Sequence, residues 1–554
     1  MTAPLSPVLI VGSGPSGLIA ALTLLKNGIP VRIIEKVDKF HNAQRGAGIM
    51  PRSLEVYHFL GVDEISNLGQ HLKPRCSYEL PGGRKPKLIF EMSPRMEPTP
   101  DVPFINTLLL GQHHAEEIFR AHIEKFGVHV ELGSTLVDFE QDSVGVTAHI
   151  VKKSGDFESR EVIRTPFLIG TDGSRGITRN KLGLTFVGES RPADHLIVAD
   201  LYVDGLDTKY WHTWGDFTTA IVTLRPTEYE DRFSLILGGR DIDYKPLLES
   251  REKLIKFVVD ATDRDDLVFG DIIGVSEFSP NIRMVDRFSK GRVFVVGDAA
   301  HVHSPTGGQG MNSSIQDSFN LGWKMALVCK GLASLSLLET YNEERTPVIK
   351  QMLEQTTKIL DRTMKAKVDK ESFNAAFNRP KALHQLGVNC RWSSIVIDER
   401  HPFDHHGDKG ALEAYGNEAE QSIRAGDRAP DAPGLTDGDY KTSLFDILKP
   451  HQHTVLIFDS ACANLQQILD ALDTWPEGTV QRVVIIGKDS HCKQSNPSVS
   501  AIVLEDAQGH VFNAYGGIAA DGYPIVVIRP DGVIGAIVKG VEGLMKYRHG
   551  VLLQ

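Results

Sequence analysis

The amino-acid sequence predicts an α/β fold in three parts: a domain built on parallel strands, a mainly antiparallel β-sheet inserted into it, and a smaller α/β domain at the C-terminus. Residues 7–36 read as strand, helix and strand, the unit from which parallel sheets are built. Residues 184–285 are a series of short alternating runs typical of an antiparallel sheet. After a polar stretch rich in Gly, Asp and Pro, apolar runs such as "HTVLIFD" and "VQRVVIIG" indicate the separate α/β unit.

The composition is that of a globular protein. The chain has 554 residues, of which 41% are hydrophobic and 24% charged, and a formal net charge of -11. A chain of this length exceeds one core, and the negative charge argues against binding of nucleic acid or an anionic membrane. The apolar runs are far shorter than the roughly 20 residues of a membrane span. No signal peptide pattern precedes the first strand, so we expect a cytoplasmic protein.

The first strand-helix-strand unit carries a glycine fingerprint. Gly12, Gly14 and Gly17 form the GxGxxG of "VGSGPSG", between the strand "PVLIVG" and the helix "SGLIAALTLLKNG". The first glycine permits a tight turn, the second admits a pyrophosphate, and the third lets helix and strand pack closely. Glu35, at the end of the second strand, is placed to accept hydrogen bonds from a ribose diol. The unit predicts a Rossmann-like dinucleotide-binding domain, with NAD and FAD both open at this point.

Three further segments favour FAD. "RGAGIMPRSLE" brings Arg45 after the strand-helix-strand unit, where it can pair with a pyrophosphate or ribose. "FLIGTDGSRG" places Asp172 at the end of one strand. "VFVVGDAAH" places Asp298 at the end of another, where its carboxylate can bind a ribityl hydroxyl. An NAD dehydrogenase has no use for this second acidic strand end.

The segment "GDAAHVHSPTGGQGMN" combines glycines with the start of a helix. Gly307, Gly308 and Gly310 keep Cβ atoms away from a flat ligand, and backbone N–H groups at a helix N-terminus favour negative charge. We therefore expect a flat, electron-poor group, held by main-chain N–H groups, to lie against this loop. We interpret His301 and His303 as packing or hydrogen-bonding residues rather than as metal ligands or acid-base groups.

Together, GxGxxG with Glu35, the Asp172-Gly173 segment and "GDAAHVHSPTGGQGMN" resemble the class A flavoprotein aromatic hydroxylases, the family of p-hydroxybenzoate hydroxylase. The C-terminal part, with "SLFDIL" and "RPDG", resembles the phenol 2-monooxygenase branch, which adds a thioredoxin-like domain. The resemblance implies a Rossmann-like FAD-binding domain with bound FAD, and it assigns Pro305 to the catalytic site at the flavin face. The cofactor-binding residues that it implies are Gly12, Gly14, Gly17, Glu35, Arg45, Gln112, Asp172, Asp298, Gly308, Gly310, Met311 and Asn312.

The implied reaction has two halves. NADPH or NADH reduces FAD by hydride transfer, and O2 then forms a C4a-hydroperoxyflavin that transfers one oxygen atom to an aromatic ring. The ring must be electron-rich, which predicts a substituted phenolic substrate activated by a base or cation, in natural-product metabolism and with or without decarboxylation. The alternative is a flavin oxidase or reductase of a non-phenolic substrate on the same fold. The resemblance also implies a homodimer.

The substrate side departs from the phenol hydroxylase pattern. Ala47 replaces an acidic residue in "RGAG", and Ser234 stands where a tyrosine is expected. The segment "LYVDGLDTKYWHTWGD" offers substitutes, with His212 as a candidate base. Arg240 is a candidate cation for a substrate carboxylate or phenolate. The candidate pocket walls are Tyr210, Trp211 and Trp214.

The predicted domains follow from these patterns. The FAD-binding domain comprises residues 1–183 and, together with further helices, 286–402; the substrate-binding sheet comprises 184–285. Residues 403–433 are predicted to be a linker and 434–554 the thioredoxin-like domain. The five cysteines include no CxxC and no metal-ligand spacing, so this last domain is expected to be structural or dimer-forming rather than redox-active. No metal is expected.

Overall fold

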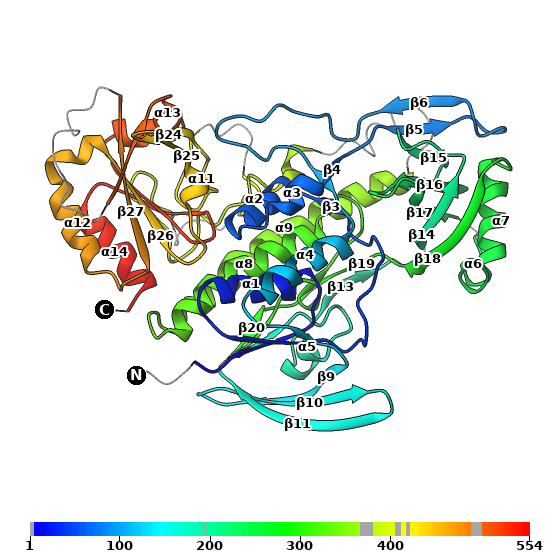
Figure 1. Ribbon diagram of the computed structural model, residues 1–554, viewed down its shortest axis with the longest axis horizontal. Helices are drawn as coiled ribbons and strands as arrows, with labels where there is room; N and C mark the ends of the chain where they lie inside the picture. The colour runs from blue at the N-terminus through cyan, green and yellow to red at the C-terminus, as the bar shows by residue number, and fades with distance from the viewer. Residues whose placement is uncertain are drawn as a thin grey trace.

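The computed structural model describes residues 5–191, 194–240, 242–365, 380–404, 412–416, 422–488 and 501–553. A central body of helices and sheet lies between two further sheets (Figure 1). The C-terminal sheet is on the left of Figure 1 and the inserted sheet on the right. The expected division into a nucleotide-binding body, an inserted sheet and a C-terminal α/β unit is therefore visible in the arrangement of the elements.

The central sheet has the parallel order expected of a Rossmann-like domain. Its order is β20-β21-β12-β1-β2-β8, and every neighbouring pair except β20-β21 is parallel. The residues of β1 and β21 are all buried, as is typical of parallel strands covered on both faces. The strands are β1 (Val8–Val11), β2 (Val31–Ile34), β8 (Val130–Glu131), β12 (Leu168–Gly170), β20 (Ser289–Lys290) and β21 (Val293–Val295).

Helices cover this sheet and connect it to the rest of the molecule. The helices of this body are α1 (Pro15–Lys26), α2 (Pro51–Phe59), α3 (Glu64–Leu68), α4 (Gln112–Glu124), α5 (Ile177–Leu182), α8 (Gly310–Cys329) and α9 (Ser336–Lys365). α1 packs against α4 and α8, and α9 packs on α8 (Figure 1). α8 is buried from Asn312 to Leu327, so its polar side chains must find partners inside the protein.

Three small sheets complete the central body. Residues expected to form a meander give an antiparallel sheet of β9 (Ser134–Gln141), β10 (Val146–Ser154) and β11 (Phe157–Thr165). A second sheet holds β3 (Gly48–Ile49), β7 (Leu108–Leu109) and β4 (Gln70–His71). A third holds β13 (Val187–Ser190), β19 (Asn281–Met284) and β22 (His301–Val302), and the 3-10 turn η1 (Gly297–Ala299) precedes β22.

The inserted sheet has seven strands in the order β18-β14-β17-β16-β15-β5-β6. All its pairs are antiparallel except β15-β5. Two strands come from outside the predicted 184–285 segment, because residues 75–90 supply β5 and β6. α6 (Tyr244–Glu249) and α7 (Arg251–Thr262) cover one face. The strands are β5 (Arg75–Tyr78), β6 (Pro86–Phe90), β14 (Leu196–Asp204), β15 (Trp211–Gly215), β16 (Ala220–Pro226), β17 (Arg232–Gly239) and β18 (Val268–Phe278).

The C-terminal sheet is mixed, in the order β23-β30-β29-β26-β27-β28-β24-β25. β26, β27 and β28 are parallel, β29 runs antiparallel to β26 and β30, and β30 pairs parallel with β23. Its strands are β23 (Ile397–Asp398), β24 (Pro433–Asp437), β25 (Tyr440–Ser443), β26 (His453–Phe458), β27 (Val480–Ile486), β28 (Ile502–Asp506), β29 (Ile525–Ile528) and β30 (Ile534–Val538). Its helical segments are α11 (Leu444–Ile447), η3 (Asp459–Asn464), α12 (Leu465–Asp473), α13 (His510–Ala520) and α14 (Val541–Val551). The thioredoxin-like assignment stays a prediction.

The border of this C-terminal unit differs from the predicted linker. β23 lies in the segment assigned to the FAD-binding part, yet it pairs with β30. Within the described residues 422–433, Ala425, Ala429 and Ala432 are buried. Small side chains permit this close packing, so a composition typical of a linker here forms a packed connection. The 3-10 turn η2 (Lys381–His384) precedes this connection.

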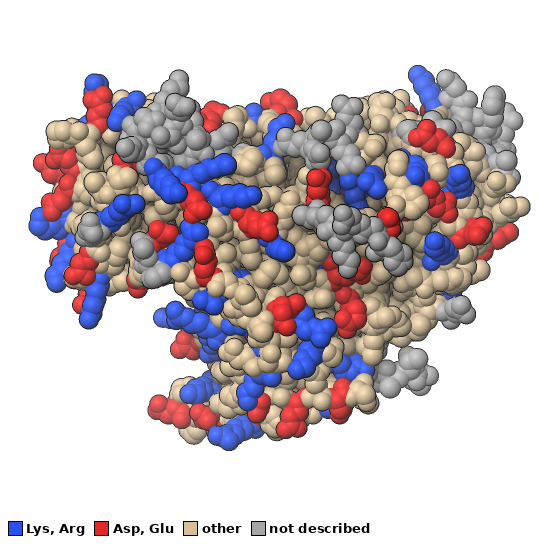
Figure 2. Space-filling view, turned by 180° about the vertical axis from the view of Figure 1, so that it is seen from behind, with Lys and Arg blue, Asp and Glu red and all other residues tan. Residues whose placement is uncertain are grey.

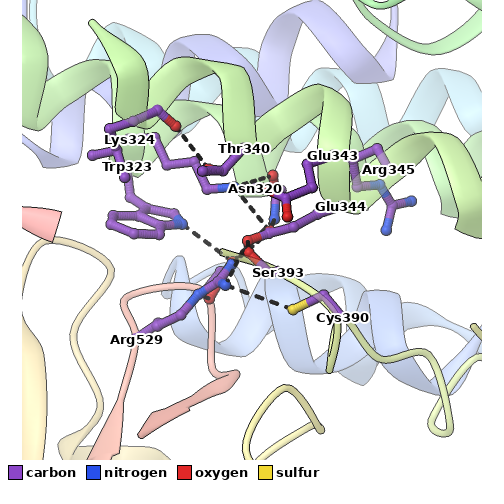
Figure 3. A network of polar contacts seen from close by, with 12 residues as sticks. Asn320, Trp323, Lys324, Thr340, Glu343, Glu344, Arg345, Cys390, Ser393 and Arg529 are labelled. Atoms are coloured by element: carbon purple, nitrogen blue, oxygen red, sulfur yellow. Dashed lines mark hydrogen bonds and ion pairs between the residues drawn. The ribbon is translucent and has the colours of Figure 1, made fainter. Parts of the chain in front are cut away.

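A buried charge network fastens the C-terminal unit to the central helices (Figure 3). Arg529, just after β29, donates to Glu344 of α9 at 2.9 and 3.0 Å and to Asp531 at 3.0 Å. Lys324 of α8 donates to Glu344 at 2.8 Å, and Trp323 Nε1 donates to Asp531 at 3.1 Å. All five residues are buried. The two parts therefore share one polar core.

Two surface properties concern the whole molecule. Within the described residues, no helix combines the length and the apolar character that crossing a bilayer requires. Basic and acidic side chains are interspersed on the face drawn in Figure 2, in keeping with 60 Lys and Arg against 71 Asp and Glu.

Candidate functional site: a flavin cleft and the face of the inserted sheet

Four residues singled out in the sequence meet at one edge of the central sheet. Gly12, Glu35, Asp172 and Asp298 follow the neighbouring strands β1, β2, β12 and β21, each just beyond the strand's carboxyl end. In open parallel sheets, ligands bind in the crevice outside these ends. The parallel order of the strands thus brings residues from four distant parts of the sequence to one edge.

The three fingerprint glycines differ in what surrounds them. Gly12 has φ +106, and a Cβ there would lie 2.3 Å from the carbonyl oxygen of Thr171. A Cβ at Gly17 would lie 2.0 Å from the Gly12 oxygen, so this glycine lets α1 approach the turn. Gly14 is the N-cap of α1, and a Cβ there would meet nothing within 4 Å. An open cradle therefore lies at the N-terminus of α1, where a phosphate is favoured.

The carboxylates of Glu35 and Asp172 lie beside this cradle and its neighbouring strand. Glu35 accepts hydrogen bonds from the backbone N and Oγ of Ser13 at 2.8 and 3.2 Å. One oxygen of Asp172 accepts from Thr178 N and Oγ1 at 2.9 and 2.8 Å, while the other is buried without a hydrogen-bond partner. Burial raises the pKa of Asp172. Because an unpaired buried acceptor is costly, a hydroxyl donor from a bound cofactor fits this site.

Asp298, Arg45 and Gln112 lie around the same region. The Asp298 side chain is accessible to solvent yet surrounded by protein, as a side chain lining a cleft is; loss of bulk water raises its pKa, and the charges of His301 and Arg45 oppose that rise. Arg45 is exposed, with φ 43. Gln112, the first residue of α4, accepts from Gly46 N at 3.3 Å. These contacts bring the Arg45 loop and the start of α4 together.

The glycine loop before α8 is held by amide side chains. Gln309 Nε2 donates to the carbonyl oxygens of Gly307 and Leu383 at 2.9 and 3.0 Å. Gln385 Nε2 donates to Gln309 Oε1 at 2.8 Å. Gly307 and Gly308 have φ +90 and +63, which other residues adopt at a cost. Sequence reasoning found the glycines but missed Gln385, 76 residues after the glutamine that it binds.

Asn312 fixes the first turn of α8. Its Nδ2 donates to the carbonyl oxygens of Gly48 and Gly308 at 2.9 and 2.7 Å, and its Oδ1 accepts from Met50 N at 2.8 Å. Its side chain is therefore committed to the protein, which leaves its backbone N–H for a ligand. The other predicted flavin-side residues, Pro305, Gly310 and Met311, lie at least partly accessible along the same loop and first turn.

His301 and His303 hydrogen-bond within the protein. His301 Nε2 lies 2.7 Å from Asp317 Oδ2, and Arg345 Nε donates to the other oxygen of Asp317 at 2.7 Å. His303 Nδ1 lies 2.5 Å from the carbonyl oxygen of Ser304. Burial and the neighbouring His301 lower the pKa of His303 to about 4, so this ring is neutral at physiological pH.

On the substrate side, the structure does not bring His212 or Arg240 to the cleft. His212 has no exposed surface, and its ring nitrogens lie 2.7 Å from Tyr78 OH and from the carbonyl oxygen of Asp207. It stacks with Trp214 on the sheet face that α6 and α7 cover. Burial lowers its pKa. Alternation along β15 turns this residue to the helix-covered side. There both of its ring nitrogens lie at hydrogen-bond distance from protein oxygens.

Arg240 lies beyond the end of a strand, and the remaining aromatic candidates divide between the two faces of the inserted sheet. Arg240 is exposed just beyond β17, where its backbone N donates to Thr219 O. Tyr210 packs at the edge of the helix-covered core. Trp211 lies in β15 next to His212, and its side chain packs with the residues of the opposite face. Of the aromatic candidates, it is the one that lies on the face opposite α6 and α7.

We call this opposite face the inner face of the inserted sheet. Register places Asp200, Ser234 and Arg225 in one row across β14, β17 and β16. The Arg225 guanidinium lies 5.9 Å from the Trp211 ring. Asp200 Oδ1, Thr223 Oγ1 and Trp211 Nε1 are buried without hydrogen-bond partners in the described protein. An apolar patch adjoins this row, formed by Met92, Leu196, Phe217 and Ile221.

The inner-face residues were missed because alternation within one strand does not reveal the partners across strands. Ser234 was noted in the sequence, whereas Asp200 and Arg225 gave no local signal. An open phosphate cradle at the edge of the central sheet and partly unsatisfied polar groups on the inner face are features of an α/β protein that binds a nucleotide cofactor and a small molecule.

Comparison with known proteins identifies the class. A family model described as "FAD binding domain" matches residues 6–356. A flavin-dependent monooxygenase of Mycobacteroides abscessus is 33% identical over 464 residues, 81% of this chain and 88% of the relative. Pentachlorophenol 4-monooxygenase of Sphingobium chlorophenolicum is 28% identical over 542 residues, 96% and 93% of the two chains.

Solved structures share the fold over the whole length. The flavin-dependent monooxygenase PieE, in complex with FAD and substrate, aligns with a TM-score of 0.78 at 21% identity and covers 99% of this chain and 98% of its own. Aklavinone-11 hydroxylase with FAD and aklavinone aligns at 0.77 and 22% identity, with full coverage of both chains. The chain belongs to this family of FAD-dependent aromatic hydroxylases, as the glycine and acidic motifs indicated, and its class of activity is flavin-dependent monooxygenase.

Proposed function

We propose that the enzyme hydroxylates a phenolic ring held between the glycine loop before α8 and the inner face of the inserted sheet. The observation that carries the proposal is the composition of that face. It combines an apolar patch with buried polar atoms that have no protein partner, namely Asp200 Oδ1, Thr223 Oγ1 and Trp211 Nε1. Such a surface suits a ligand that is largely apolar and has a hydroxyl group at one position.

The spacing of two contacts along α9 supports room for aromatic rings between the glycine loop and the inner face. Thr356 of α9 accepts a hydrogen bond from Thr306 of the glycine loop at 3.1 Å. Met364 of the same helix packs against the apolar patch of the inner face. These two residues are eight positions apart, about 12 Å of helix. A bound ring system of one or more aromatic rings fits a separation of this order.

Asp200 and Arg225 are the proposed activating pair. Asp200 Oδ2 accepts from Gln44 N at 2.6 Å, in the segment where Ala47 replaces the acidic residue of the phenol hydroxylase pattern. Its free Oδ1 would accept the phenol proton, and the buried guanidinium of Arg225 would stabilise the phenolate. FAD supplies the oxygen-activating chemistry, and these side chains orient the ring and polarise its hydroxyl.

Several finer assignments belong to the same proposal. NADPH or NADH is the proposed reductant, and the backbone N–H groups of Gly308, Gly310, Met311 and Asn312 are proposed to face the flavin. The relatives named for pentachlorophenol and for aklavinone act on phenolic or polycyclic aromatic compounds, which supports a substituted phenol over the oxidase or reductase alternative. A cytoplasmic homodimer completes the proposal.

The test combines product analysis with a matched pair of variants. The FAD-loaded enzyme receives NADPH or NADH, simple and polycyclic phenols, and 18O2. We expect at least one phenol to accelerate NAD(P)H oxidation and to gain one 18O atom; a panel without any such compound, or a product without 18O, contradicts the proposal. Asp200→Asn should lower kcat/KM about 100-fold or more, whereas Asp204→Asn, exposed on the same strand, should not.

A further inference from the structure

The start of α4 meets the connection between β16 and β17 at a cluster of two histidines and a glutamate. His113 and His114 belong to the first turn of α4, and Glu228 lies two residues after β16. One ligand atom from each residue lies within 4.8 Å of the others. We propose that these three side chains bind one divalent transition-metal ion, of which Zn2+ is the probe, and so join the cofactor-binding body to the inserted sheet.

The separations of the ligand atoms agree with a tetrahedral site. His114 Nε2 lies 3.2 Å from Glu228 Oε1, and His113 Nε2 lies 3.9 Å from the same oxygen. Nitrogen and oxygen ligands at about 2.0–2.1 Å from a tetrahedral Zn2+ stand roughly 3.4 Å apart. The two observed separations lie on either side of this value, so a small rotation of the His113 ring completes the geometry.

An independent observation points to a missing ligand. The His113 side chain is 9% exposed, and neither of its ring nitrogens has a hydrogen-bond partner in the described protein. Buried imidazole nitrogens are normally paired, because leaving one unsatisfied costs the free energy of desolvation. A metal ion between Nε2 and the Glu228 carboxylate removes that cost for one nitrogen.

Neighbouring groups support the ligands. Gln44 Nε2 donates to both oxygens of Glu228 at 2.8 Å, which fixes the orientation of the carboxylate. Tyr229 OH hydrogen-bonds to His114 Nε2 at 2.8 Å. The ion would replace this hydrogen bond, and the nearby Tyr229 oxygen or a water would take the fourth position. A Cβ at Gly111 would lie 2.6 Å from His113 Cε1 and 2.8 Å from Glu228 Oε1. Glycine at this N-cap is therefore what lets the cluster close.

The ligand chemistry selects the metal. Two imidazoles and one carboxylate suit Zn2+ and similar transition metals, whereas Mg2+ and Ca2+ prefer sites composed of oxygen atoms. The ion would cross-link α4, whose first residue is Gln112, to the connection that follows Arg225 of the inner face. The proposed role of the ion is structural: it would hold the inserted sheet against the cofactor-binding body, and it would take no part in oxygen transfer.

The experiment measures Zn2+ on the FAD-loaded full-length enzyme. Protein dialysed against EDTA is titrated with ZnCl2 by calorimetry, and the bound metal is counted by mass spectrometry after gel filtration. We expect about one Zn2+ per chain and a higher Tm with the ion. His113→Gln and His114→Gln should each bind at least about tenfold more weakly and lose the rise in Tm. His129→Gln, an exposed histidine just after α4, is the matched control and should match the wild type.

Two features of the design distinguish a loss of Zn2+ binding from a loss of folding: the flavin content of each variant and the second histidine variant. Flavin absorbance shows whether each variant keeps its fold, and His114 is 29% exposed, so its replacement is the milder one. Retention of Zn2+ by both folded variants, or binding to the wild type no tighter than to the variants, overturns the proposal. A zinc anomalous signal between His113, His114 and Glu228 in crystals would confirm it.

Discussion

At the scale of single residues, the three fingerprint glycines separate cofactor binding from folding. Gly14→Ala adds a methyl group where no protein atom lies within 4 Å, at an ordinary φ of -70. We expect the variant to fold with an unchanged apo-protein Tm but to bind FAD at least about tenfold more weakly, because the methyl group occupies the space for the pyrophosphate. Gly17→Ala should instead impair folding, since its Cβ would lie 2.0 Å from the Gly12 oxygen.

The matched control for Gly14 is Gly540. It is also an N-cap glycine, of α14, and a Cβ there also meets nothing within 4 Å. Gly540→Ala should therefore keep both the Tm and the FAD affinity. The measurement is FAD titration of apo-protein by fluorescence quenching together with thermal unfolding. Equal FAD affinity in Gly14→Ala and the wild type would show that the pyrophosphate does not lie at this helix terminus.

A second prediction at this scale concerns pH. His453 is buried among the rings of Trp323, Trp475 and Tyr547, and burial lowers its pKa to about 4. Because a histidine in the unfolded chain titrates near 6.5, the unfolded state takes up a proton first as the pH falls. The contribution of the neutral His453 to the free energy of unfolding is complete at neutral pH. It is lost between about pH 6.5 and pH 4 and amounts to roughly 3 kcal/mol.

The measurement is urea unfolding at several pH values between about 7 and 4. His453→Phe keeps a ring in the aromatic surroundings but cannot be protonated, so its free energy of unfolding should fall less steeply with decreasing pH than that of the wild type. His129→Phe, on an exposed residue, should follow the wild-type slope. Parallel slopes for all three proteins would rule out the buried His453 as a source of acid sensitivity.

At the scale of elements, local pattern predicted the kind of element but not all of its partners. The parallel unit from β1 to β2 and its glycine turn are visible in the sequence, because the helix and strand periods change within 30 residues. β5 and β6 were not assigned to the inserted sheet, since the parallel pairing of β5 with β15 joins residues 75–77 to 211–213. A strand pattern does not contain such long-range register.

This lack of long-range register also explains why sequence reasoning chose His212 on the substrate side and did not choose Asp200 and Arg225. His212 was chosen for its chemistry, yet its place in β15 turns it toward α6 and α7, where both nitrogens are bonded. Asp200 and Arg225 were not chosen, and they meet only because β14, β17 and β16 align in one register. The His113, His114 and Glu228 cluster likewise joins residues more than 100 positions apart. Spatial clusters of this kind follow from topology, which single-chain periodicity does not supply.

At the scale of the whole molecule, buried polar contacts join the C-terminal unit to the central helices. The network around Arg529 joins β29 to α8 and α9, and α9 also contacts both the glycine loop and the inner face. A buried charge that loses its partner is strongly destabilising. Disturbance of the C-terminal unit should therefore reach the flavin cleft through α9.

The prediction for this scale compares a buried ion pair of the C-terminal unit with an exposed ion pair of the inserted sheet domain. Arg529→Met leaves the buried Asp531 without its cation and leaves Glu344 paired with Lys324 alone, and it should cost about 3–5 kcal/mol. Lys256→Met breaks an ion pair with Asp260 in α7, whose two side chains are 75% and 61% exposed, and should cost less than about 1 kcal/mol. Urea unfolding is followed by tryptophan fluorescence and by flavin release. One shared transition that moves to lower urea in Arg529→Met supports a common core. A separate early transition in which FAD stays bound would instead show that the C-terminal unit unfolds independently.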